Sequence, residues 1–84
     1  MIALNTVRPG ANVRIRRLDA SPEVSTRLRE MGFCENATVR CLQSGAACVC
    51  LVQHCRVALG AQLAQLILVE PALDRLPVFA EAGL

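Results

Sequence analysis

Four residues able to ligate a metal ion lie close together in the middle of this 84-residue chain: Cys48, Cys50, His54 and Cys55. Thiolate sulfur and imidazole nitrogen are ligands that zinc and iron accept in proteins. Exposed cysteines can also carry redox chemistry, and we expect Cys34 and Cys55 to be exposed. One interpretation of the segment is therefore a site for Fe²⁺ or Zn²⁺, or a redox sensor.

The other interpretation is that the cysteines fill a core. Residues two apart on a strand are separated by about 6.6 Å along the chain, whereas two thiolates on one zinc ion lie about 3.8 Å apart. If Gln53 and His54 form a two-residue turn, Cys50 lies near Val57 on the next strand. Cys41 then lies across from Cys50, and all face inward as small hydrophobes. Spacing favours this second interpretation, in which His54 faces solvent and no cofactor is required.

A second candidate site is the end of a predicted helix. Val24, Leu28 and Met31 recur at helical spacing, which predicts a stripe packed on the core. Arg27 and Arg29 are either simply solvated or in contact with a partner. The candidate partner contacts at this helix end are Arg27, Arg29, Met31 and Phe33.

The chain shows no recognisable set of catalytic residues. It has one histidine, and the sequence has no phosphate loop, no paired carboxylates in a recognisable motif and no nucleophile spaced suggestively from a base. We therefore expect a binding protein and not an enzyme.

Composition also argues against nucleic acid and membrane as partners. The only aromatic residues are Phe33 and Phe79, too few for a base-stacking platform. The formal charge is +2, although four arginines lie between Arg8 and Arg17, a stripe that could meet an acidic partner. The longest apolar run, Ala46 to Val52, is far shorter than the roughly 18 to 20 residues of a spanning helix. The amino terminus has no secretion-signal pattern, so we expect a cytoplasmic protein without direct membrane insertion.

Periodicity predicts a mostly β fold. Alternation predicts strands at residues 12–18, 38–42, 48–52, 55–59 and 66–69. Ser21 and Pro22 begin a helix that Gly32 ends, and residues 60–65 suggest a short helical turn. Because closing a sheet removes exposed edges, we predict a small SH3-like barrel of five to six strands over residues 1–71. Residues 72–84 are then a C-terminal tail, mobile or docked on a partner.

Several motifs occur in the order found in a known family. They are Leu4, the Pro9-Gly10 turn, the helix end Arg27-Leu28-Arg29-Glu30-Met31-Gly32-Phe33, the segment Val57-Ala58-Leu59, and Ala64-Gln65-Leu66-Ile67-Leu68-Val69. This order resembles the FeoA family over residues 2–70, with Leu28, Gly32, Leu59 and Ala64 at its structural positions. Asn36 stands where the family often has glycine, and Gln53-His54-Cys55 replaces a glycine-bearing turn.

The resemblance implies an accessory protein of bacterial ferrous iron uptake. Such a protein would act with the membrane transporter FeoB, whose cytosolic part contains a GTP-binding domain, and would sit at the inner membrane only through that partner. A metal- or redox-sensing regulatory domain built on the Cys/His hairpin is the alternative. Another alternative is a homodimer in which the tail docks on a neighbouring barrel.

Overall fold

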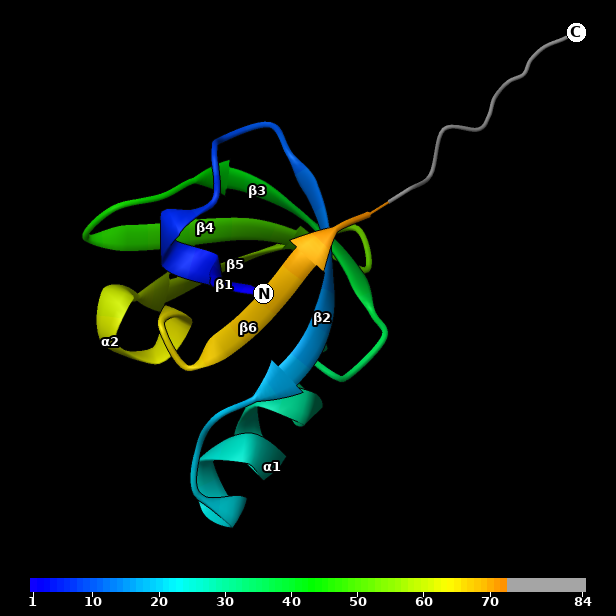
Figure 1. Cartoon of the computed structure of the whole chain (residues 1–84), viewed down its shortest axis with the longest axis vertical. Helices are drawn as coiled ribbons and strands as arrows, with labels where there is room; N and C mark the ends of the chain where they lie inside the picture. Colours follow the sequence, from blue (N-terminus) through cyan, green and yellow to red (C-terminus); the bar gives the residue numbers. More distant parts are fainter. Residues whose placement is uncertain (73–84) are drawn as a thin grey trace, which may run out of the picture.

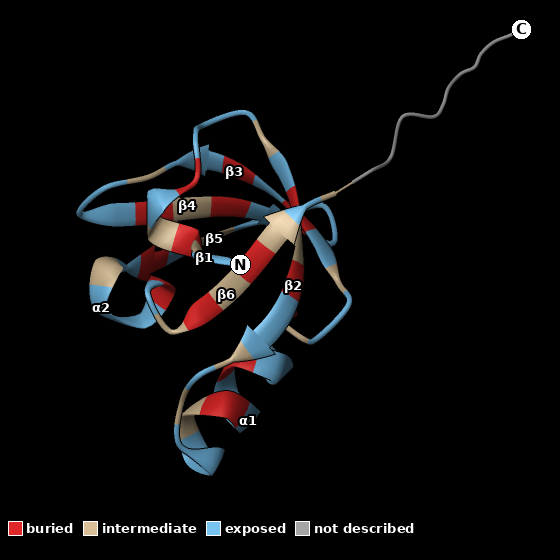
Figure 2. Ribbon diagram, viewed as in Figure 1, coloured by how far each residue is buried: buried red, intermediate tan, exposed pale blue. Residues whose placement is uncertain are grey.

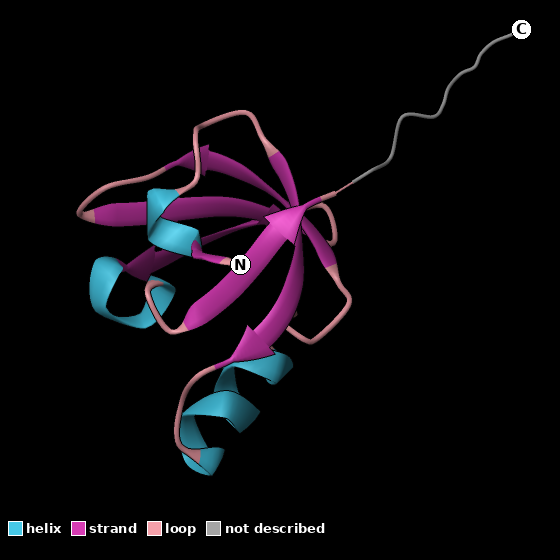
Figure 3. Ribbon diagram, in the orientation of Figure 1, coloured by secondary structure: helices cyan, strands magenta, loops and turns pink. Residues whose placement is uncertain are grey.

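The structure, a computed structural model, describes residues 1–72 as one six-stranded antiparallel sheet with two helices and a 3-10 turn (Figure 1). The elements in chain order are β1 (Ile2–Ala3), η1 (Leu4–Thr6), β2 (Asn12–Leu18), α1 (Pro22–Glu30), β3 (Thr38–Gln43), β4 (Ala47–Val52), β5 (Cys55–Gly60), α2 (Ala61–Ala64) and β6 (Ile67–Pro71). The strand order across the sheet is β1-β6-β2-β3-β4-β5. Figure 3 shows the strands curling around one interior, with α1 at one end. The mostly β, SH3-like fold with one main helix is thus confirmed.

Most predicted elements are confirmed to within two residues. The exceptions are β1 and η1, which sequence periodicity did not reveal because each is only two or three residues long. Strand β6 also runs further than predicted, to Pro71, which lies opposite Val13 of β2. The N–H of Ala72 then donates to the carbonyl of Asn12. Apart from Ala72, the predicted tail lies outside the described residues.

The core lies inside the curled sheet and is built largely by alternation along the strands. Figure 2 shows buried bands alternating with exposed ones along the strands, as expected when successive side chains point to opposite faces. The largest fully buried side chain is Phe33, which follows α1. The other large side chains in this set are Leu4, Ile15, Leu28, Ile67, Val39, Val69, Cys41, Cys48 and Cys50. Among the described residues, no helix is long and apolar enough to cross a membrane.

Helix α1 begins and ends where its capping residues predict. The Oγ of Ser21 accepts a hydrogen bond from the N–H of Val24, and Pro22 occupies the first turn. At the other end Gly32 has φ +99°, its N–H donates to the carbonyl of Arg29, and the N–H of Phe33 donates to that of Leu28. These two bonds form a Schellman motif, which satisfies the last helical carbonyls and turns the chain inward.

Candidate functional site

The β4–β5 hairpin has the register that the sequence predicts. Gln53 and His54 both have positive φ, 50° and 70°, so they form a two-residue turn of the kind that hairpins favour. Cys50 lies opposite Val57 on β5 and opposite Cys41 on β3. The predicted pairing of these three residues is therefore confirmed.

Three thiols form a cluster within the core. Cys41, Cys48 and Cys50 have no exposed surface, and the sulfurs of Cys48 and Cys50 are 3.8 Å apart. The prediction that backbone spacing would keep these two sulfurs apart was wrong. Both side chains point to the concave side of a curled sheet, where side chains two apart converge. The Sγ of Cys41 also lies 3.8 Å from the carbonyl oxygen of Val7.

The four predicted metal ligands are not brought together. Cys48 and Cys50 are buried, whereas His54 and Cys55 are exposed at the hairpin turn. In the part of the chain that the structure describes, no group of three or more His, Cys, Asp or Glu side chains is placed to hold a metal ion. Burial, with the neighbouring Cys48 as a smaller cause, raises the pKa of the Cys50 thiol and also that of Cys41. Both thiols are therefore neutral near pH 7 in the metal-free protein.

The four predicted partner contacts at the end of α1 differ in their exposure: one is buried and three are exposed. Phe33 has no exposed surface, so its prediction as a contact was wrong: the Schellman turn directs it into the core. Met31 is 40% exposed, so its placement in the packed stripe was wrong, because it caps the helix outside its buried face. It remains available to a partner. Arg27 is exposed and makes no ion pair with any residue in 1–72.

Arg29 is already engaged by a carboxylate. Its Nε and one terminal nitrogen donate to the two carboxylate oxygens of Glu35 at 3.1 and 2.8 Å, the two-pronged geometry that suits arginine. The hydrogen bond from Arg29, followed by backbone bonding, lowers the pKa of Glu35 to about 2, and the same bond raises the pKa of Arg29. A partner would have to compete with Glu35 for this side chain.

A basic row on the outer face of the sheet was missed by the sequence analysis. Arg40 of β3 lies opposite Leu51 of β4, which lies opposite Arg56 of β5, and all three are exposed. We call these three residues the outer row. Neither arginine of the row makes an ion pair with another residue of 1–72.

The arginine stripe that drew attention in the sequence is partly neutralised. Arg16 lies 3.7 Å from a carboxylate oxygen of Glu70, and Arg17 lies 3.7 Å from one of Asp19. Within residues 1–72, Arg8 and Arg14 of the stripe make no ion pair, and the outer row brings two more unpaired arginines, distant in sequence, onto one face of the sheet. Only the strand register could have revealed it.

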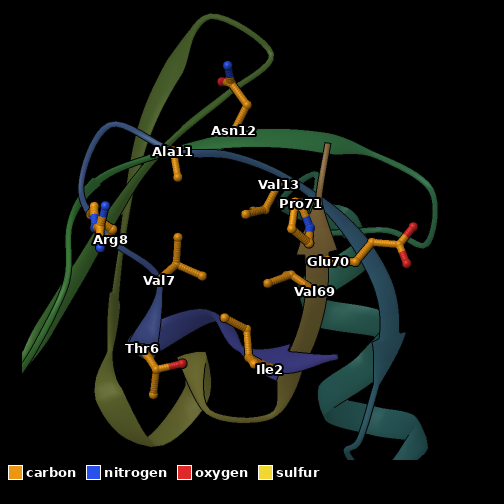
Figure 4. A pocket seen from close by; sticks show the side chains of 10 residues that line it. All are labelled: Ile2, Thr6, Val7, Arg8, Ala11, Asn12, Val13, Val69, Glu70 and Pro71. Atoms are coloured by element: carbon orange, nitrogen blue, oxygen red, sulfur yellow. The ribbon is translucent and has the colours of Figure 1, made fainter. Parts of the chain in front are cut away.

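An apolar pocket of about 170 Å³ opens between the amino-terminal segment and strands β2 and β6. Figure 4 shows Ile2, Val7, Val13 and Val69 pointing into it, with Glu70 directed away. An apolar cavity of comparable size can take a single benzene-sized group. The sequence analysis missed this pocket because β1, which brings Ile2 to its edge, was not predicted.

The predicted structural positions are all buried. Leu28, Leu59 and Ala64 are at most 4% exposed, and Gly32 is buried as well. A Cβ added to Gly32 would lie 2.6 Å from Cγ1 of Val52, the last inward residue of β4. Gly32 is therefore required both by its positive φ and by the close approach of the hairpin.

The sequence model of the FeoA domain matches residues 2–71. The chain belongs to the FeoA domain family. Comparison with curated protein sequences found no match. The family assignment confirms the resemblance seen in the motif order and places the protein among small domains associated with iron transport.

Solved structures show the same fold. The solution structure of iron(II) transport protein A from Clostridium thermocellum is 30% identical over 83% of this chain, with a TM-score of 0.75. This chain spans 45% of that protein's length. A crystal structure of the iron uptake regulatory protein FeoA is 24% identical, with 84% of this chain and 96% of that one covered and a TM-score of 0.78. A structure of ScaR with bound Zn²⁺ is 20% identical over 86% of this chain and 37% of ScaR, with a TM-score of 0.77, and this likeness shows the fold alone.

Proposed function

We propose that this protein is a non-enzymatic cytoplasmic accessory of bacterial ferrous iron uptake that binds the transporter FeoB through its cytosolic GTP-binding domain. The observation that carries the proposal is the FeoA domain match over residues 2–71. The C. thermocellum protein of similar structure is an iron(II) transport protein A, which agrees with the proposal. Regulation or assembly of the transporter is then a matter of surface contact, with no resident cofactor required.

The described surface suits contact better than chemistry. The thiols of Cys41 and Cys50 are buried and neutral, so they serve packing. Exposed arginines, in contrast, stand without a carboxylate partner from residues 1–72 on the outer row and at Arg8 and Arg27. An exposed charge is stable in water on its own, and it forms its most favourable interactions when a partner of opposite charge approaches.

A metal- or redox-sensing role is the second candidate, favoured by the 3.8 Å approach of the Cys48 and Cys50 sulfurs. It predicts stoichiometric iron or zinc in protein purified without oxygen, or a loss of free thiols on mild oxidation. Elemental analysis measures the first. Thiol titration measures the second when the folded protein is treated with oxidant and then unfolded, because three of the thiols are buried in the fold. Protein free of metal and with five titratable thiols after oxidant treatment would remove this candidate.

The main proposal is tested in a strain lacking this gene. Ferrous iron uptake should fall in that strain and return when the gene is restored, and the purified protein should associate with the FeoB cytosolic domain. The association is measured by calorimetry with GTP analogue, with GDP and without nucleotide. Normal uptake in the deletion strain together with no association in any nucleotide state would reject the proposal.

A further inference from the structure

Strand β5 is an edge of the sheet that no other strand of residues 1–72 covers. It is the last strand in the order β1-β6-β2-β3-β4-β5. Pairing of Val52 with Cys55 closes the two-residue turn, so alternate residues of β5 bond to β4 and the others direct their N–H and C=O groups outward. The outward-directed residues are Arg56 and Ala58, both exposed. Within residues 1–72, neither makes a backbone hydrogen bond to a loop or helix.

The outer row ends at this edge. Arg40, Leu51 and Arg56 follow one another across β3, β4 and β5, and Val49 lies opposite Ala58 beside them. A strand added to β5 would place one side chain directly opposite Arg56 and another opposite Ala58, with Cβ atoms about 5 Å away. A carboxylate of the added strand suits the position opposite Arg56. An apolar side chain suits the position opposite Ala58, because Ala58 lies beside the half-buried Val49.

A second copy of the chain fits the edge poorly. Pairing two β5 strands would bring two outer rows, each with two arginines free of ion pairs, into one continuous sheet. Like charges in neighbouring strands are destabilising, and charged residues at an edge are a common means of preventing self-association. The same charges attract an acidic partner, so charge complementarity favours a different protein.

Building on the proposed function, we propose that β5 binds an extended acidic segment of the transporter's cytosolic domain as an added strand. The backbone groups of Arg56 and Ala58 supply the hydrogen bonds, and the outer row supplies selectivity for acidic side chains. This division of roles is general for strand addition, in which the main chain gives affinity and alternate side chains give specificity.

The test compares point variants for binding to the purified FeoB cytosolic domain by calorimetry. Ala58→Pro removes one outward N–H while leaving the bonds of β5 to β4, since proline is tolerated where an edge N–H faces solvent. We expect at least a tenfold loss of affinity, and the matched control Ala58→Thr should bind within threefold of the unchanged protein. Arg56→Glu should also lose at least tenfold. Arg17→Glu makes the same change in net charge at an exposed position of β2 and should lose less than threefold.

The outcomes separate this inference from the function on which it rests. Binding of the unchanged protein with equal binding by Ala58→Pro would overturn the inference and leave the proposed function intact. No binding by the unchanged protein in any nucleotide state would overturn the inference and, together with normal uptake in the deletion strain, would reject the proposed function itself. If Ala58→Pro fails to fold, Arg56→Glu and Arg40→Glu decide, and affinities equal to that of Arg17→Glu overturn the inference. A change of oligomeric state in the β5 variants, measured by light scattering, would instead identify a second copy as the occupant and overturn it too.

Discussion

The two faces of the β4–β5 hairpin carry different kinds of residues for different purposes. On the inner face Cys48 and Cys50 are fully buried and touch each other. On the outer face Leu51 and Arg56 lie opposite each other in water, in line with Arg40. The same short stretch of chain therefore builds core on one side and a basic surface on the other.

The difference shows how alternation rearranges a sequence cluster. Cys48, Cys50, His54 and Cys55 are close in sequence but divide between interior and turn. The outer row comes from three strands and is contiguous only in the sheet. A cluster of reactive residue types along a strand is therefore a weak guide to a site, because neighbouring positions point to opposite faces.

Gly32→Ala is expected to cause the largest loss of stability, because it disturbs the packing on the inner face of the hairpin. The new Cβ would lie 2.6 Å from Val52 at a residue with φ +99°. A left-handed residue costs about 1 to 2 kcal/mol and overpacking about 1 to 3 kcal/mol, so the free energy of unfolding should fall by about 2 to 5 kcal/mol. Urea unfolding measures it.

Gly10→Ala is the matched control for that variant. Gly10 has φ +93° but nothing within 4 Å of an added Cβ, so only the conformational cost of about 1 to 2 kcal/mol should appear. Equal losses for the two variants would show that the approach of the hairpin to the helix end does not constrain Gly32.

The second prediction contrasts a buried thiol with an exposed one. Cys50→Ser places a hydroxyl in the core, where polar burial costs about 1 to 3 kcal/mol in protein variants. Cys55→Ser at the exposed turn should change the free energy of unfolding by less than about 0.5 kcal/mol. Thermal or urea unfolding of the two variants checks the difference. A Cys50→Ser protein as stable as Cys55→Ser would mean that the inner face is open to water.

The same burial makes stability depend on pH. Because burial raises the pKa of Cys41 and Cys50 in the folded state, the unfolded chain loses these protons first. The contribution of these two thiols to the free energy of unfolding is complete below the ordinary thiol pKa of about 8.5. It is lost as the pH rises above that value. Between pH 8.5 and 9.5 we expect the free energy of unfolding to fall by about 1 to 2 kcal/mol.

Cys50→Ala provides the control for the pH effect. With one of the two shifted thiols removed, its stability should fall less steeply over the same pH range. Urea midpoints at a series of pH values measure both slopes, and an equally steep fall in the variant would assign the dependence to other groups.

The smallest change in stability is expected at the turn that joins β4 and β5. Gln53 and His54 both adopt positive φ, which glycine and asparagine tolerate better. Replacing them with Asn and Gly should raise the free energy of unfolding by about 1 kcal/mol without altering the register. Unfolding measurements check the gain, and a loss of stability would indicate that these side chains make contacts worth more than the strain.

Much of the fold could be predicted from the sequence, because many elements are set by residues that act on their near neighbours in the chain. Ser21, Pro22 and Gly32 mark the ends of α1, and the alternation in residues 12–18 gives β2 its bounds. The turn at Gln53-His54 set the register that places Cys50 opposite Val57. Each of these depends on residues near one another in the chain.

The features that the sequence analysis missed depend on distant segments. Strand β1 is two residues long and exists because it pairs with β6. Phe33 looked like a surface residue beside a polar helix end, but the Schellman turn directs it inward. The outer row and the apolar pocket arise only when the strands are aligned, so no local pattern could reveal them.

Residue-resolved amide hydrogen exchange, in the presence and absence of the FeoB cytosolic domain, tests the central claim most directly. In the free protein the N–H groups of Arg56 and Ala58 should exchange quickly, because they point outward from an uncovered edge. In the complex both should slow by at least tenfold, while the amides of Arg27 and Met31 stay unchanged. Protection confined to the end of α1, with Arg56 and Ala58 unchanged, would contradict the account and return the partner surface to the helix.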